Sequence, residues 1–210
     1  MFTNRSEAGR MLATRLRKYK NIPGVVLAVP RGGVPVAYEI AKELNIPLEV
    51  ILVKKLGHPN NKEYAIGAVG LKDSFVLPHE NVTQHYIETE IANIRERLKE
   101  MQASFMGDKE PQNLTGKTVI LVDDGIATGN TILGTVQVLR KSQPYKIVLA
   151  VPVASQSAME KLEPFVEEMV VLLCPESFRS VGLFYSDFSQ VSDEEVIHYL
   201  DKLNALKKIS

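Results

Sequence analysis

The stretch VILVDDGIATGNT, residues 119–131, places four apolar residues directly before two acids and a short turn rich in Gly and Thr. The apolar run has the length of a buried strand, and the turn leads into a segment of helical period. In an open α/β sheet the ligand crevice lies outside the carboxyl ends of the strands, and the free N–H groups of a helix start attract phosphate. The stretch therefore predicts an anion site at residues 127–131.

The residue types in this stretch suit a sugar phosphate. Gly129 permits close backbone approach, while the hydroxyls of Thr128 and Thr131 can donate to phosphate oxygens. Asp123 and Asp124 would repel a phosphate beside them, so they are better suited to accept hydrogen bonds from a diol or to hold hydrated Mg²⁺. The alternative is an ordinary strand, turn and helix with acids at the boundary, although a Walker A partner motif is absent.

Working outward, apolar runs of strand length alternate with segments of helical period, which predicts an α/β domain with a mainly parallel sheet flanked by helices. Strands are predicted at residues 25–29, 48–53, 65–69, 119–122, 147–151 and 166–173, with a short one at 74–77. Helices are predicted at residues 5–19, 34–44, 83–105, 131–140, 154–162 and 193–206. Residues 57–63, 107–116 and 175–190 are expected to be loops, and residues 1–210 are expected to form one domain.

Composition limits the classes of partner. The chain has 210 residues with 25 basic and 25 acidic side chains, so no overall field would draw it toward nucleic acid or an anionic membrane. It lacks an apolar segment of the length that a signal peptide or a membrane span needs, which predicts a cytoplasmic protein. Cys174 is the single cysteine, which excludes an internal disulfide and gives no metal-ligand spacing.

A second anion loop is predicted at PRGG, residues 30–33, between the first predicted strand and an amphipathic helix. The Arg31 guanidinium can bind a diphosphate in a forked geometry, and Gly32 and Gly33 let backbone amides face the ligand closely. The alternative is a Gly-rich turn with an exposed Arg. The later acid-bearing loop, in the right order along the chain, favours the functional interpretation.

Residues 119–131 resemble the phosphoribosyl-pyrophosphate motif of type I phosphoribosyltransferases, and PRGG resembles the pyrophosphate loop of the xanthine-guanine enzymes. The resemblance covers nearly the whole chain and is strongest to a group of uncharacterised bacterial and archaeal members. It implies the family fold, with a small hood at residues 175–190, a flexible lid loop at residues 57–67 and a cis peptide at Pro30-Arg31. The phosphoribosyl-pyrophosphate-binding residues that it implies are Asp123, Asp124, Ala127, Thr128, Gly129, Asn130, Thr131, Arg31, Gly32 and Gly33.

The resemblance also implies a catalytic set of Asp123, Asp124, Arg31 and Lys55, in which Lys55 reaches the pyrophosphate from the end of the second strand. A solvated charge pair with Lys54 is the alternative. In the hood, ring stacking on the acceptor base is expected of Phe184, Tyr185 and Phe188. Mg²⁺ would be held by Asp123, Asp124 and Asp187, in part through water.

The activity that the resemblance implies is transfer of a phosphoribosyl group from Mg²⁺-phosphoribosyl pyrophosphate to a nucleobase or related nitrogen acceptor, with release of pyrophosphate. Small-molecule substrates, a place in nucleotide metabolism and a homodimer are typical of the family. Ala127 stands where hypoxanthine and guanine enzymes have the aspartate that handles the purine N7 proton, and Gly125 replaces a usual apolar residue, so the acceptor stays open. The alternative function is a catalytically inactive regulator or sensor that binds phosphoribosyl pyrophosphate or a nucleotide.

Overall fold

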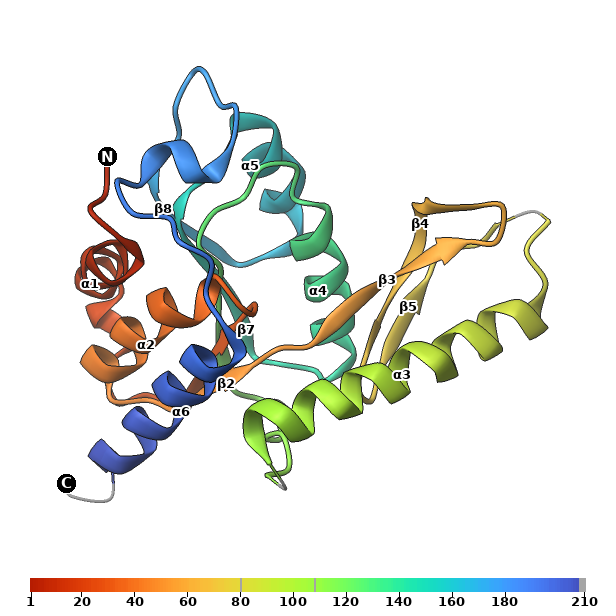
Figure 1. Ribbon diagram of the computed structural model, residues 1–210, viewed down its shortest axis with the longest axis horizontal. Helices are drawn as coiled ribbons and strands as arrows, with labels where there is room; N and C mark the ends of the chain where they lie inside the picture. Colours follow the sequence, from red (N-terminus) through yellow and green to blue (C-terminus); the bar gives the residue numbers. More distant parts are fainter. Residues whose placement is uncertain (80, 108, 208–210) are drawn as a thin grey trace.

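A five-stranded parallel sheet forms the centre of the molecule in the computed structural model, which describes residues 1–79, 81–107 and 109–207 (Figure 1). Its strand order is β2-β1-β6-β7-β8, and every neighbouring pair is parallel. The strands are β1 (Gly24–Ala28), β2 (Leu48–Val50), β6 (Thr118–Val122), β7 (Lys146–Val153) and β8 (Glu168–Leu173). The predicted α/β class with a mainly parallel sheet is confirmed.

Helices cover both faces of this sheet. Side chains alternate along each strand, so Val26 and Ile120 join the core under α1, α2 and α6, while Val25 and Val119 face α4 and α5. The helices are α1 (Arg5–Arg15), α2 (Gly33–Leu44), α3 (Gln84–Met106), α4 (Asn130–Lys141), α5 (Gln156–Leu162) and α6 (Asp193–Lys207), with short 3₁₀ turns at Arg17–Tyr19, Glu163–Phe165 and Val181–Phe184. Double coverage explains why the central strands read as continuous apolar runs.

A second sheet forms an arm, defined here as β3 (Val53–His58), β4 (Asn61–Gly70) and β5 (Ser74–Val76) together with α3. Its strands pair antiparallel, and both α3 and α4 pack against it. Figure 1 shows the far end of the arm projecting away from the five-stranded sheet. The prediction of one strand at residues 48–53 was wrong, because the chain leaves the central sheet after Val50 and enters the arm at Val53.

The prediction of a loop at residues 57–63 was also wrong. These residues form the β3–β4 hairpin, in which His58 pairs with Asn61 and register shifts occur around Gly57. Lys55 therefore lies within β3, opposite Ala68, and does not end a strand of the central sheet. Cross-strand hydrogen bonding organises a stretch whose Gly, Pro and Asn content suggests an irregular loop.

The N-terminal residues meet the segment predicted as the hood. Phe2 forms an isolated parallel bridge with Tyr185, in which the Ser186 N–H donates to the Phe2 carbonyl at 2.8 Å. The Asp187 N–H donates to the Thr3 carbonyl at 2.9 Å.

Residues 80, 108 and 208–210 of the predicted domain lie outside the described part of the chain. None of the helices in the described part combines the length and the apolar character that a membrane span requires.

Candidate functional site

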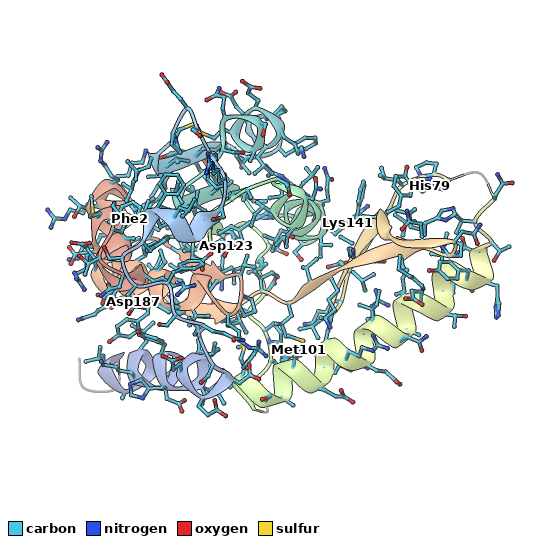
Figure 2. The ribbon with its side chains drawn as sticks, turned by 45° about the horizontal axis from the view of Figure 1, so that its top comes forward. Phe2, His79, Met101, Asp123, Lys141 and Asp187 are labelled. Carbon is cyan, nitrogen blue, oxygen red and sulfur yellow. The ribbon has the colours of Figure 1, made fainter. Side chains whose placement is uncertain are left out.

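Two loops meet at the carboxyl ends of neighbouring strands. The arginine loop, residues 30–33, follows β1, and the acid pair, Asp123 and Asp124, follows β6 directly. Glycine is required where they touch, because a Cβ on Gly32 would lie 2.0 Å from Asp124 Oδ2 and one on Gly33 would lie 2.8 Å from the Val122 carbonyl. The Pro30-Arg31 peptide is cis. Figure 2 shows Asp123 on the same side of the molecule as Phe2 and Asp187, away from His79 on the arm.

The predicted phosphate loop, residues 127–131 and called the phosphate loop below, packs against α5 and its N-cap residue Ser155. The Ser155 hydroxyl donates to the Ala127 carbonyl at 2.6 Å. Gly129 has a φ of 74°, and a Cβ added there would lie 3.3 Å from Leu162 Cδ1. None of the described side chains caps the N-terminus of α4, which begins at Asn130. Its first N–H groups are therefore available to an anion.

Lys161 adds a cation beside the phosphate loop. Its ammonium group donates to the Thr128 carbonyl at 2.7 Å and to Asn130 Oδ1 at 2.9 Å. The sequence gives no local sign of this contact, because Lys161 reads as one exposed charge on a short helix. Its position reinforces a loop whose surroundings favour negative charge on a ligand.

Burial governs the acid pair. The Asp123 carboxylate accepts from the Asp124 N–H at 2.8 Å, and desolvation, with the neighbouring charge of Asp124, raises the pKa of Asp123 well above its usual range. Desolvation also raises the pKa of Asp124, against the opposing effect of Arg5. Two half-buried carboxyl groups that resist ionisation gain from a cation or from hydroxyl donors, so these residues fit Mg²⁺ or a sugar diol.

Arg5, at the start of α1, is a site residue that sequence reasoning missed. Its Nε donates to Asp124 Oδ2 at 2.9 Å, and its Nη1 donates to the Ser189 carbonyl at 2.8 Å. The guanidinium carbon lies 3.9 Å from the centre of the Phe188 ring. The side chains of Arg5 and Asp124 are only 10% and 14% exposed, so this ion pair is largely removed from water.

Arg31 pairs with the first residue of α6. Its Nε donates to Asp193 Oδ1, and its Nη2 donates to Oδ2 at 3.2 Å. Asp193 raises the pKa of Arg31 through this hydrogen bond and its charge. The two side chains are 45% and 43% exposed. The Arg31 guanidinium, predicted to bind a diphosphate, is therefore accessible to solvent and paired with the Asp193 carboxylate.

The three aromatic residues expected to stack on a base differ in exposure. Tyr185 is buried between Phe2 and Phe188, with ring centres 5.3 and 5.1 Å away, and its hydroxyl donates to the Asp124 carbonyl at 2.6 Å. The Tyr185 ring is therefore covered in this structure, and its expected stacking on a base stays a prediction. Phe188 keeps about a third of its surface exposed, and Phe184 packs on Phe178 at 5.5 Å.

The remaining predicted residues are less closely tied to the acid pair. The Asp187 carboxylate is exposed, and it accepts from the Ser189 N–H at 3.0 Å, which lowers its pKa. Lys55 is exposed in the arm sheet, on an element other than those that carry the two loops. In the residues that the structure describes, no three His, Cys, Asp or Glu side chains cluster as a metal site.

Comparison with known proteins identifies a family whose domain model spans the arginine loop and the acid pair. Residues 4–183 match the model of the phosphoribosyl transferase domain. A Mycobacterium tuberculosis protein named provisionally as a phosphoribosyl transferase is 39% identical over 207 residues, which cover 96% of this chain and 47% of that protein. The chain thus spans about half the length of the curated relatives that it matches most extensively.

Two further relatives differ in extent. The bifunctional protein PyrR of Brevibacillus brevis is 42% identical over 75 residues, covering 34% of this chain and 42% of that protein. The crystal structure of TT1426 from Thermus thermophilus is 38% identical, superposes with a TM-score of 0.88, and covers 97% of this chain and 99% of its own. Since the domain match includes the arginine loop, the acid pair and the phosphate loop, the chain belongs to the phosphoribosyl transferase domain family.

Proposed function

We propose that the protein is a phosphoribosyltransferase that binds Mg²⁺-phosphoribosyl pyrophosphate, transfers the phosphoribosyl group to a nucleobase or related nitrogen acceptor, and releases pyrophosphate. The observation that carries the proposal is the meeting of the arginine loop, the acid pair and the phosphate loop at the carboxyl ends of two adjacent strands. This edge is where open α/β sheets bind ligands.

Each part of the site has a proposed role. The N–H groups of residues 127–131 hold the 5′-phosphate, and Asp123 and Asp124 accept hydrogen bonds from the ribose hydroxyls. Arg31 exchanges Asp193 for the pyrophosphate, while Gly32 and Gly33 let the backbone approach it. Mg²⁺ bound with the substrate would be held by Asp123 and Asp124 and would neutralise charge on the leaving pyrophosphate. The protein residues therefore contribute positioning and electrostatic stabilisation of positive charge that develops on the ribose.

The acceptor belongs to the hood side of the proposed site. Phe184, Tyr185 and Phe188 are the candidate stacking residues, and Tyr185 and Phe188 would have to expose ring surface that their neighbours cover here. Ala127 supplies no acid for a purine proton. We further propose that residues 1–210 act as one domain, with the β3–β4 hairpin as the lid carrying Lys55 and with Asp187 as an outer metal contact. A cytoplasmic place in nucleotide metabolism, small-molecule partners and a homodimer complete the proposal.

A regulator or sensor that binds the same ligand without turnover is the second candidate. It is favoured by one observation, the neutral Ala127 at the position where purine enzymes carry an acid. Such a protein would keep the acid pair and the phosphate loop, so it would bind Mg²⁺-phosphoribosyl pyrophosphate. It would release no pyrophosphate with any acceptor.

Calorimetric titration with Mg²⁺-phosphoribosyl pyrophosphate tests the shared binding step. Asp123→Asn removes a charged acceptor, worth about 1.5–3 kcal/mol, and should weaken binding about tenfold or more. Asp201→Asn, an exposed change on α6, is the matched control. Equal affinity of the wild-type protein and Asp123→Asn would contradict the proposed role of the acid pair.

A screen of nucleobases and small amines for pyrophosphate release separates the two functions. The enzyme proposal expects at least one acceptor to give release that depends on Mg²⁺ and is lost in Asp123→Asn. Binding without release across the whole screen would favour the regulator. If the protein neither binds Mg²⁺-phosphoribosyl pyrophosphate nor releases pyrophosphate, both candidate functions are ruled out.

A further inference from the structure

Arg5 connects three parts of the site that are far apart in the sequence. It lies at the first residue of α1, contacts the acid pair through Asp124 and contacts the hood segment through Ser189 and Phe188. The carboxylate and carbonyl contacts are 2.9 and 2.8 Å long, so both are well-formed hydrogen bonds. One side chain thus fixes the hood relative to the predicted ribose ligands.

The geometry uses features that only arginine has. The planar guanidinium donates from Nε to Asp124 and from Nη1 to the Ser189 carbonyl, while its face covers the Phe188 ring. A lysine has one compact ammonium group, so it could keep the charge but not this combination of in-plane donors and a stacked face. Shape as well as charge is therefore required at residue 5.

Asp124 is held from several sides. Arg5 binds its carboxylate, the Tyr185 hydroxyl donates to its carbonyl, and Gly32 packs so closely that an added Cβ would overlap Oδ2. A carboxylate so enclosed has little freedom to choose another position. The ribose hydroxyls of a ligand would meet a carboxylate that is already oriented, which lowers the entropy lost on binding.

We propose that Arg5 is a positioning residue of the phosphoribosyl site, which orients the Asp124 carboxylate toward the ribose hydroxyls and ties the hood segment to the acid pair. The inference rests on the proposed function. Arg5 acts through Asp124 and does not contact the ligand. Its removal should weaken ligand binding by more than loss of fold stability explains, because Asp124 then turns away from its required orientation.

Calorimetric titration with Mg²⁺-phosphoribosyl pyrophosphate tests this proposal on Arg5→Ala, Arg5→Lys and Arg10→Ala. Arg10 is on the same helix and makes an exposed 3.4 Å contact with Glu39, so its variant is the matched control. Arg5→Ala should bind about 10- to 100-fold more weakly, the loss expected when a hydrogen bond to a charged acceptor is no longer made. Arg5→Lys should fall between Arg5→Ala and the wild type, and Arg10→Ala should match the wild type.

Chemical rescue separates positioning from support of the fold. Millimolar methylguanidinium should occupy the space left in Arg5→Ala and restore several-fold tighter binding, without changing the affinity of the wild type or of Arg10→Ala. Unchanged affinity in folded Arg5→Ala overturns the proposal, as does weakened affinity that methylguanidinium cannot restore. If Arg5→Ala fails to fold, Arg5→Lys decides, and wild-type affinity in that variant overturns the proposal. A wild-type protein that does not bind the ligand refutes the proposed function itself, and this inference with it.

Discussion

Two arginine–aspartate pairs flank the same site, and they differ in their access to water. Arg5–Asp124 is buried between α1, the acid pair and the hood, whereas Arg31–Asp193 is nearly half exposed at the start of α6. A buried pair whose partner is removed leaves an uncompensated charge, while water replaces either partner of an exposed pair at small cost. The first pair can serve as a fixed part of the site, and the second can exchange.

The difference matters for ligand binding. Arg31 is the proposed pyrophosphate ligand, and its donors already bind the Asp193 carboxylate. A diphosphate offers more charge in the same forked geometry, so it can displace Asp193 with little loss of solvation. Arg5 has no comparable freedom, since its other donor is bound to Ser189 and its face to Phe188.

The largest expected effect is the difference between the two ion pairs in their contribution to the free energy of unfolding. Asp124→Ala leaves Arg5 charged and buried, and should cost about 3 kcal/mol, whereas Asp193→Ala should cost less than about 1 kcal/mol. Urea denaturation of both variants measures the two costs. Similar costs for the two substitutions would show that the buried and exposed pairs do not differ as described.

A smaller effect concerns the acid that Arg5 does not hydrogen-bond. The folded state raises the pKa of Asp123 above its ordinary 3.8, so the folded protein retains that proton more firmly than the unfolded chain. Wild-type stability should therefore fall relative to Asp123→Asn as the pH rises from about 4 through the folded-state pKa. Urea denaturation of both proteins across this pH range gives the difference. A difference that stays constant, or that moves in favour of the wild type, would refute the raised pKa.

The smallest expected effect is a change in ligand affinity when the exposed Arg31–Asp193 pair is removed. Asp193→Asn should release the Arg31 fork and tighten binding of Mg²⁺-phosphoribosyl pyrophosphate about two- to fivefold, because an exposed pair contributes under about 1 kcal/mol. Glu194→Gln, one residue along α6, is the charge-matched control. The gain should shrink between about 0.05 M and about 0.5 M salt, which screens exposed charges. Weaker binding in Asp193→Asn would mean that Asp193 supports the fork instead of competing for it.

Local patterns predicted the central sheet and the two loops. Strands such as β6 are buried on both faces and bounded by Gly or acid residues, so their apolar runs stand out. The arginine loop and the acid pair are each contiguous, and both follow a strand directly. Parallel pairing of β1 with β6 then places the arginine loop beside the acid pair.

Contacts between distant residues could not be predicted in this way. Arg5 reads as one of several basic residues in the first predicted helix, and Tyr185 as one of several aromatic residues in a loop. Their roles come from Asp124, which neither adjoins in sequence. The arm was missed for a related reason, since a β-hairpin rich in Gly, Pro and Asn has the composition of an irregular loop.

The same distant contacts set an order of events during synthesis. Arg5 leaves the ribosome early, Asp124 follows 119 residues later, and the Ser189 carbonyl comes 184 residues after Arg5. Contacts across such separations form late, because the chain must close long loops to make them. Residues 185–189 can contact Arg5 and Asp124 only after they have emerged, so a shorter nascent chain would hold this ion pair without those contacts.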